Sequence, residues 1–111
     1  MMERIDRSVL AGLSESVGED FLGELIDTFL EEAPGMFDEM KRALSDGDAD
    51  TFRRAAHSLK TNANTFGAME LAEQAKELEY MARENELDIG NRLQVLKETY
   101  ENAAKELKSL G

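Results

Sequence analysis

The sequence predicts an all-α protein, an antiparallel, up-and-down four-helix bundle with an additional short N-terminal helix. Two observations carry this prediction. The composition favours helices, with a single Pro in the chain, and apolar residues recur at three- and four-residue spacing in segments that short polar turns separate. Short turns make successive helices antiparallel neighbours. We expect one domain, residues 1–111, around one hydrophobic core.

The first two helices should lie before residue 45. The first is expected to begin after Asp6, a suitable N-cap, and to end near Gly18. Its apolar positions are Ile5, Val9, Leu10 and Leu13. The second has an apolar stripe that should face the core, made of Phe21, Leu22, Leu25, Ile26, Phe29 and Leu30. Because Pro34 cannot donate a helical hydrogen bond, we expect a kink or break there and a restart through Met36, Phe37, Met40 and Leu44.

The rest of the chain should form three more helices. Residues 45–50, SDGDAD, read as a turn in which Asp48 or Asp50 caps the next helix. That helix should run to about Phe66, before a reversal at Gly67-Ala68. The following helix buries Leu71, Ala75, Leu78 and Ala82 and closes near Asn85. The last helix is expected from near Asp88, with an apolar seam of Ile89, Leu93, Leu96, Tyr100, Ala103 and Leu107.

The segment 51–69, TFRRAAHSLKTNANTFGAM, contains the only histidine of the chain. One face of its predicted helix is apolar and should be buried, through Phe52, Ala55, Ala56, Leu59, Ala63 and Phe66. The opposite face carries Arg53, His57, Lys60 and Asn64 in one stripe. The histidine should therefore face water or a partner.

The charge of this segment differs from that of the whole chain. The chain has 13 Lys+Arg and 24 Asp+Glu, a net charge of −11. Residues 51–69 contain Arg53, Arg54, Lys60 and no acid, so they contribute +3 and the rest carries −11 − 3 = −14. A lone imidazole on a helix surface is most often only solvated. An imidazole among cations on an acidic protein, however, suits a dianion such as phosphate.

The run from Ala56 to Glu79, AHSLKTNANTFGAMELAEQAKELE, resembles the signature of histidine-containing phosphotransfer (HPt) domains of bacterial two-component phosphorelays. The matching positions are His57, Lys60, Thr61, Gly67-Ala68 and Leu78-Glu79. The resemblance covers nearly the whole chain without insertion. Thr61 stands where the family most often has Gly, and its branched side chain could narrow the approach of a partner.

The resemblance implies a phosphocarrier. His57 would reversibly accept a phosphoryl group from the aspartyl-phosphate of a response-regulator receiver domain and pass it to another receiver aspartate. Lys60 would stabilise the phosphoryl oxygens, and Arg53, Arg54, Thr61 and Asn64 would contribute to docking, beside an apolar patch drawn from Leu10, Leu13, Val17 or Met69. The sequence has no Gly-rich phosphate loop, so the catalytic Mg²⁺ should come from the receiver. A hybrid histidine kinase is a possible further partner.

The hairpin geometry suggests a residue that orients the histidine. If the chain reverses at Gly67-Ala68, residues ten to twelve positions after the turn return to the height of His57, since each residue of a helix rises about 1.5 Å. Leu78 and Glu79 lie at that height, and Leu78 belongs to the buried stripe. Glu79 is therefore the polar side chain best placed to approach His57, and a carboxylate there would fix the tautomer of the ring.

Other classes of function fit the sequence less well. The absence of Cys excludes disulfides and thiolate sites, and one His among scattered carboxylates lacks metal-ligand spacing, so neither a metal nor a cofactor is expected. The net negative charge argues against nucleic acid or an anionic membrane as partner. Without an apolar signal segment, the chain is expected in the cytoplasm, as a monomer. Two alternatives stay open: a helical interaction module in which His57 is incidental, and the dimerising phosphoacceptor part of a histidine kinase.

Overall fold

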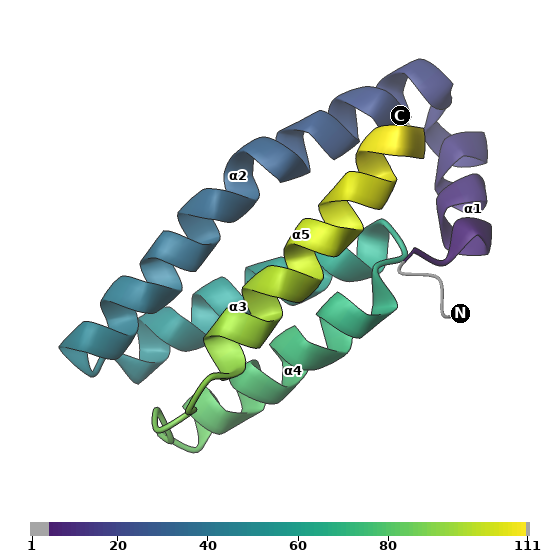
Figure 1. The fold of residues 1–111 in the computed structure, drawn as a ribbon. Coiled ribbons are helices and arrows are strands. Elements are labelled where there is room, and N and C mark those ends of the chain that lie inside the picture. Colours follow the sequence, from purple (N-terminus) through teal and green to yellow (C-terminus); the bar gives the residue numbers. More distant parts are fainter. Residues whose placement is uncertain (1–4, 111) are drawn as a thin grey trace.

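The computed structural model describes residues 5–110, which form five helices and no strand. They are α1 (Arg7–Val17), α2 (Glu19–Asp46), α3 (Ala49–Thr65), α4 (Met69–Arg83) and α5 (Arg92–Leu110). Helices α2 to α5 form an antiparallel bundle, and α1 crosses the end where α3 turns into α4 (Figure 1). The predicted fold class is therefore confirmed. Within residues 5–110, no helix is long and apolar enough to span a membrane.

The helix starts follow the expected capping residues. Asp6 accepts a hydrogen bond from the Ser8 backbone N–H at 3.0 Å, and Asp48 accepts one from the Thr51 N–H at 3.1 Å. These bonds satisfy backbone donors that the first turn of a helix leaves free. Helix α2 continues to Asp46 and α3 begins at Ala49, so the turn between them is shorter than the predicted 45–50 segment.

The core forms where the apolar faces of the bundle meet. The apolar stripe predicted for α3 is buried at every position: Phe52, Ala55, Ala56, Leu59, Ala63 and Phe66. The rings of Phe29 and Phe66 stack with centroids 5.3 Å apart, and Tyr100 meets Phe29 edge-on at 5.9 Å. Aromatic pairs in these two arrangements stabilise beyond their buried area. They join α2, the end of α3 and α5.

A kink or a break was predicted at Pro34, and the break is wrong, because α2 runs through this residue as one helix. Pro34 has no N–H to donate to the carbonyl of Leu30, one turn earlier. The hydroxyl of Tyr100 on α5 donates to that carbonyl instead, over a long 3.5 Å. A partner from another helix therefore satisfies the acceptor that the proline leaves free.

Two further expectations need correction. Phe21 was expected in the core but is 50% exposed, because in the first turn of α2 it is the next residue, Leu22, that faces and packs against the core. The last helix begins at Arg92 rather than near Asp88. Gly90 has a left-handed φ of 61°, which a right-handed helix cannot contain. Ile89 therefore belongs to the loop before α5, and its side chain is buried in the core from there.

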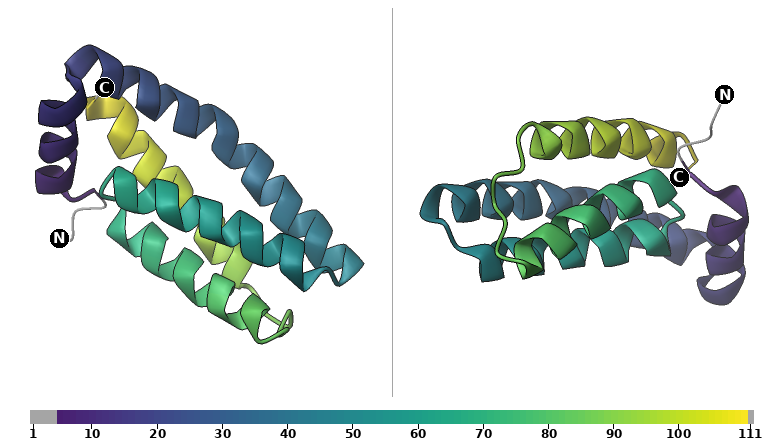
Figure 2. Two further views of the ribbon diagram at one scale, coloured as in Figure 1. Left: turned by 180° about the vertical axis from the view of Figure 1, so that it is seen from behind. Right: turned by 90° about the horizontal axis from the view of Figure 1, so that it is seen from below.

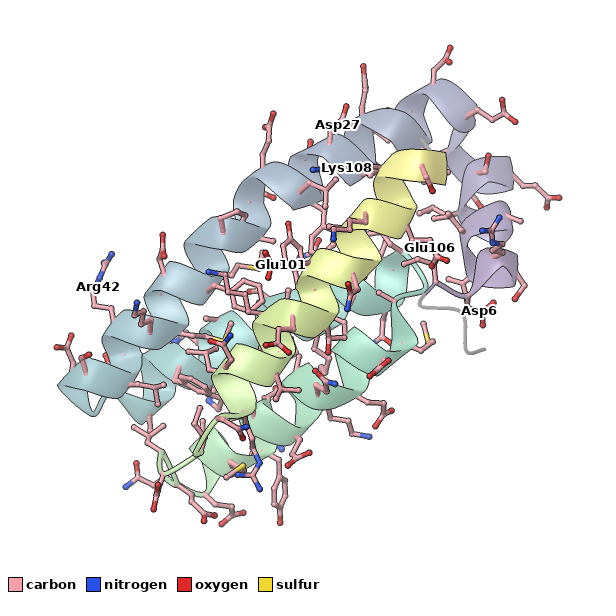
Figure 3. The ribbon with its side chains drawn as sticks, in the orientation of Figure 1. Asp6, Asp27, Arg42, Glu101, Glu106 and Lys108 are labelled. Carbon is pink, nitrogen blue, oxygen red and sulfur yellow. The ribbon has the colours of Figure 1, made fainter. Side chains whose placement is uncertain are left out.

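Helix α1 is anchored on the α3–α4 turn. The Asp6 N–H donates to the Gly67 carbonyl at 2.7 Å, next to the fully buried Ile5. Figure 3 labels Asp6 at the start of α1. Gly67 has φ of 77°, and a Cβ there would lie 2.6 Å from the Asp6 carbonyl oxygen. Only a residue without a side chain lets these two backbones approach so closely.

We expect Gly67→Ala to lower the free energy of unfolding by roughly 2–4 kcal/mol, since it adds a backbone clash to the left-handed strain. Gly90→Ala is the matched control: its φ is also positive, at 61°, but nothing lies within 4 Å of the position that a Cβ would take. That variant should lose only about 1 kcal/mol. Urea unfolding measures both, and equal losses would contradict the close packing of α1 on Gly67.

Tyr100→Phe should cost about 1 kcal/mol of stability, because the Leu30 carbonyl would lose its donor. Tyr80→Phe, on an exposed tyrosine, is the control and should change little. In a Pro34→Ala background the new N–H can bond to Leu30, so the cost of Tyr100→Phe should shrink. An unchanged cost in that background would show that the hydroxyl does not replace the missing helical bond.

Candidate functional site

His57 lies midway along α3, and its ring is 55% exposed. Its Nδ1 atom is 2.9 Å from Oε2 of Glu79 on α4. Figure 2 shows α3 and α4 side by side along their length. Both helices bury alanines, which are short enough to let two helices approach closely: Ala56 and Ala63 on α3, and Ala72, Ala75 and Ala82 on α4. The hairpin thus brings together two residues that are 22 positions apart.

Glu79 is the one buried charged side chain among residues 5–109, with 5% of its side chain exposed. Two cations and the imidazole of His57 surround its carboxylate. Lys60 Nζ lies 2.6 Å from Oε1, while His57 Nδ1 at 2.9 Å and an Arg83 guanidinium nitrogen at 3.5 Å share Oε2. A buried carboxylate is costly without such partners.

The charge of Glu79 determines the tautomer of His57. Burial alone raises the pKa of the Glu79 carboxyl, but the hydrogen bonds and charges of Lys60 and His57 outweigh it and hold the pKa below its ordinary value. The carboxylate is therefore ionised at neutral pH and can only accept hydrogen bonds. Nδ1 must carry the proton that it donates to Oε2. The lone pair of a neutral ring then resides on Nε2, on the exposed side.

The two predicted docking arginines are already paired. Arg53 and Arg54 both donate to Asp50, which lies one residue before the segment that was counted as +3. Asp50 therefore offsets part of the +3 charge that was counted for residues 51–69. Arg54 also lines a groove between α2 and α3 with Glu31, Glu32 and Glu39, and His57 does not line this groove.

The remaining predicted site residues lie on α3, in the turn after it, on α1 and at the start of α4. Thr61 and Asn64 are exposed, one and two turns beyond His57. Gly67 and Ala68 form the buried turn. Of the apolar candidates for docking, Leu10 is buried in the core and so is excluded, whereas Met69 is exposed. Leu13 and Val17 are half-buried.

Sequence reasoning did not identify Arg83 as part of this site. The available signal was its spacing, since residues four apart lie on the same face of a helix and Arg83 follows Glu79 by four. The prediction considered the Glu79 carboxylate only as a partner for His57. The sequence did not indicate that this carboxylate is buried. Its burial is what makes the cations Lys60 and Arg83 necessary beside the imidazole.

No group of three or more metal-ligating side chains occurs in the part of the chain that the structure describes.

Comparisons with known proteins identify the family and agree with the fold. The family model of the Hpt domain matches residues 24–106. The chain is 31% identical over 109 residues to the phosphorelay protein LuxU of Vibrio cholerae serotype O1, covering 91% of this chain and 94% of LuxU. It is also similar to the crystal structure of histidine-containing phosphotransfer protein B (HptB) of Pseudomonas aeruginosa PAO1. That match has a TM-score of 0.79 and 34% identity, and covers 94% of this chain and 88% of HptB. Because the family model matches most of the chain and LuxU is 31% identical over nearly its whole length, the chain belongs to the Hpt domain family.

Proposed function

We propose that this phosphorelay intermediate carries its phosphoryl group on Nε2 of His57. One observation supports this assignment above the others: the hydrogen bond from Nδ1 to Glu79, which leaves the Nε2 lone pair on the exposed side of the ring. His57 is also the only histidine in the sequence. The neighbouring side chains then take roles in holding the ring and the transferred group.

In the transfer step, the Nε2 lone pair attacks the phosphorus of an aspartyl-phosphate. A nitrogen–phosphorus bond forms as the oxygen–phosphorus bond breaks, and the aspartate carboxylate leaves with the electron pair. The proton stays on Nδ1, so the ring gains positive charge as it gains the phosphoryl group. Glu79, which accepts the Nδ1 proton in a hydrogen bond, stabilises that charge. The reverse step returns the lone pair to Nε2.

The cations of the site act on different parts of the transferred group and the partner. Lys60 follows His57 by one turn on the same helix, and we assign it to the phosphoryl oxygens. Arg53, Arg54, Thr61 and Asn64 would contact the partner on either side of the histidine. Because Arg53 and Arg54 are bound to Asp50, they would steer a partner as a weakly charged group rather than as free cations.

The partners are proposed to be response-regulator receiver domains, with a hybrid histidine kinase as a possible further source of the phosphoryl group. This chain supplies the nucleophile, and the receiver supplies the aspartate and the Mg²⁺ that offsets charge during transfer. The chain is a phosphocarrier and not a self-sufficient enzyme. We propose that it acts as a monomer in the cytoplasm, where the aspartyl-phosphate of a receiver would meet His57.

The first experiment is incubation with a phosphorylated receiver, beside His57→Gln. Wild type should gain the mass of one phosphoryl group in an acid-labile form, and the variant should gain none. Intact-mass spectrometry before and after acid treatment measures this, and circular dichroism checks the fold of the variant. A phosphoryl group on the variant, or none on wild type from several receivers, would contradict the assignment and favour an interaction module.

Glu79→Gln should slow transfer to His57 roughly ten-fold, because a neutral amide stabilises the charged ring less than a carboxylate does. It should also cost about 1–2 kcal/mol of stability at neutral pH. Since the pKa of Glu79 is lowered in the folded state, its ion pairs contribute above the carboxyl's unfolded pKa and are lost as pH falls through the folded pKa. The stability difference should therefore vanish in acid.

Glu77→Gln is the control for this prediction. Glu77 lies on α4, two residues before Glu79, and pairs with Arg92 at the surface instead of with the histidine. Stopped-flow or quench-flow transfer rates and urea unfolding across pH would compare the two variants. If both changed the transfer rate alike, Glu79 would have no special role in orienting His57.

A further inference from the structure

The two oxygens of the Glu79 carboxylate are unequally shared. Oε1 binds Lys60 at 2.6 Å, whereas Oε2 binds His57 at 2.9 Å and has Arg83 at a looser 3.5 Å. The two cations, Lys60 and Arg83, also differ in exposure. Lys60 is 24% exposed and Arg83 is 61% exposed, so the arginine is the freer of the two permanent cations. The unphosphorylated site is thus held mainly by Lys60.

This arrangement creates a competition once His57 is phosphorylated, so the inference rests on the proposed function. The phosphoryl group would bring a charge of about −1.5 to −2 to the exposed side of the ring. Lys60, one turn away on the same helix, would be attracted by this group and by Glu79 at once. Any shift of its ammonium toward the phosphoryl oxygens weakens its bond to Oε1. Glu79 would then be a buried carboxylate with less of its counter-charge.

We propose that Arg83 is a positioning residue for the phosphorylated state: it closes on the Glu79 carboxylate as Lys60 is drawn from that carboxylate to the phosphoryl group. Glu79 thereby stays ionised and in place, and continues to accept the hydrogen bond from His57 Nδ1. The site exchanges one cation for another around a fixed carboxylate. Lys60 moves between two anions, and Arg83 makes that movement possible.

Other cations of the described hairpin lie away from Glu79. Arg53 and Arg54 bind Asp50, at the start of α3. Lys76 lines a groove on α4 with Glu73 and Glu77, and neither His57 nor Glu79 lines that groove. Arg83 shares a face of α4 with Glu79 and already lies within 4 Å of its Oε2. Tightening this contact requires only side-chain rotation.

The test is the equilibrium constant for phosphoryl exchange with a receiver. It is the ratio of phosphorylated to free protein for this chain, divided by the same ratio for the receiver. Contacts that exist only in the complex change the rates but not the equilibrium between separated proteins, so this constant excludes docking effects. Arg83→Gln should shift it toward the phosphorylated receiver roughly two- to five-fold, the size of a partly exposed ion pair. Arg83→Lys should restore most of the wild-type value.

A double-mutant cycle tests whether Arg83 acts through Glu79. In a Glu79→Gln background, Arg83→Gln should no longer shift the equilibrium, because the carboxylate that the arginine holds is gone. Arg92→Gln is the matched control, since it removes the same charge from a surface pair with Glu77 and should leave the constant unchanged. Thermal melts would check that each variant folds. Because the Arg83 side chain is exposed, its replacement should leave the fold intact.

Three outcomes would overturn the inference. An unchanged equilibrium with altered transfer rates would make Arg83 a docking residue, and an unchanged equilibrium with unchanged rates would give it no part in the reaction. A shift of equal size in the Glu79→Gln background would mean that Arg83 acts directly on the phosphoryl group. Failure of wild type to accept a phosphoryl group is a different result, which would remove the proposed function and this inference with it.

Discussion

The buried carboxylate of Glu79 is the constraint around which the site is built. A lone ionised carboxylate in a helix interface would cost several kcal/mol, so its burial requires cations at hydrogen-bonding distance. Lys60, Arg83 and the ring of His57 meet that requirement from two helices. The imidazole is one of these partners, with its Nδ1 atom 2.9 Å from Oε2. In the proposed function this contact leaves the other ring nitrogen, Nε2, to carry the phosphoryl group.

This balance depends on the register of the α3–α4 hairpin. His57 and Glu79 meet only because the chain reverses within Phe66 to Ala68, and one added residue in α4 would rotate its later side chains by about 100°. Gly67 fixes the reversal through its left-handed backbone and its carbonyl, which accepts the Asp6 N–H. Helix α1 thus caps the end of the hairpin and holds the turn that sets the register.

Periodicity and capping chemistry were enough to predict the five helices, the buried stripe of α3 and the approach of Glu79 to His57, because these follow from local geometry and helical rise. What the sequence did not reveal has two causes. Tyr100, which lies 70 positions after Leu30, donates to the Leu30 carbonyl that Pro34 leaves free, a contact between distant residues that periodicity does not encode. The partners of Arg53, Arg54 and Arg83 lie only three or four positions away, and these pairs were missed because the charge count began at residue 51 and the burial of Glu79 was not predicted.

A phosphocarrier must bind its phosphoryl group firmly enough to hold it and loosely enough to give it up. A lysine with no other partner would favour the phosphorylated state by its full attraction for the dianion. Lys60 instead begins on Glu79 at 2.6 Å, so moving toward the phosphoryl group replaces one ion pair by another. The net gain in free energy is the difference between the two ion pairs, and Arg83 reduces the free-energy cost of moving Lys60 away from Glu79. In the proposed mechanism, a buried carboxylate shared among Lys60, Arg83 and the imidazole keeps the phosphorylated and free forms close in free energy, as a reversible relay requires.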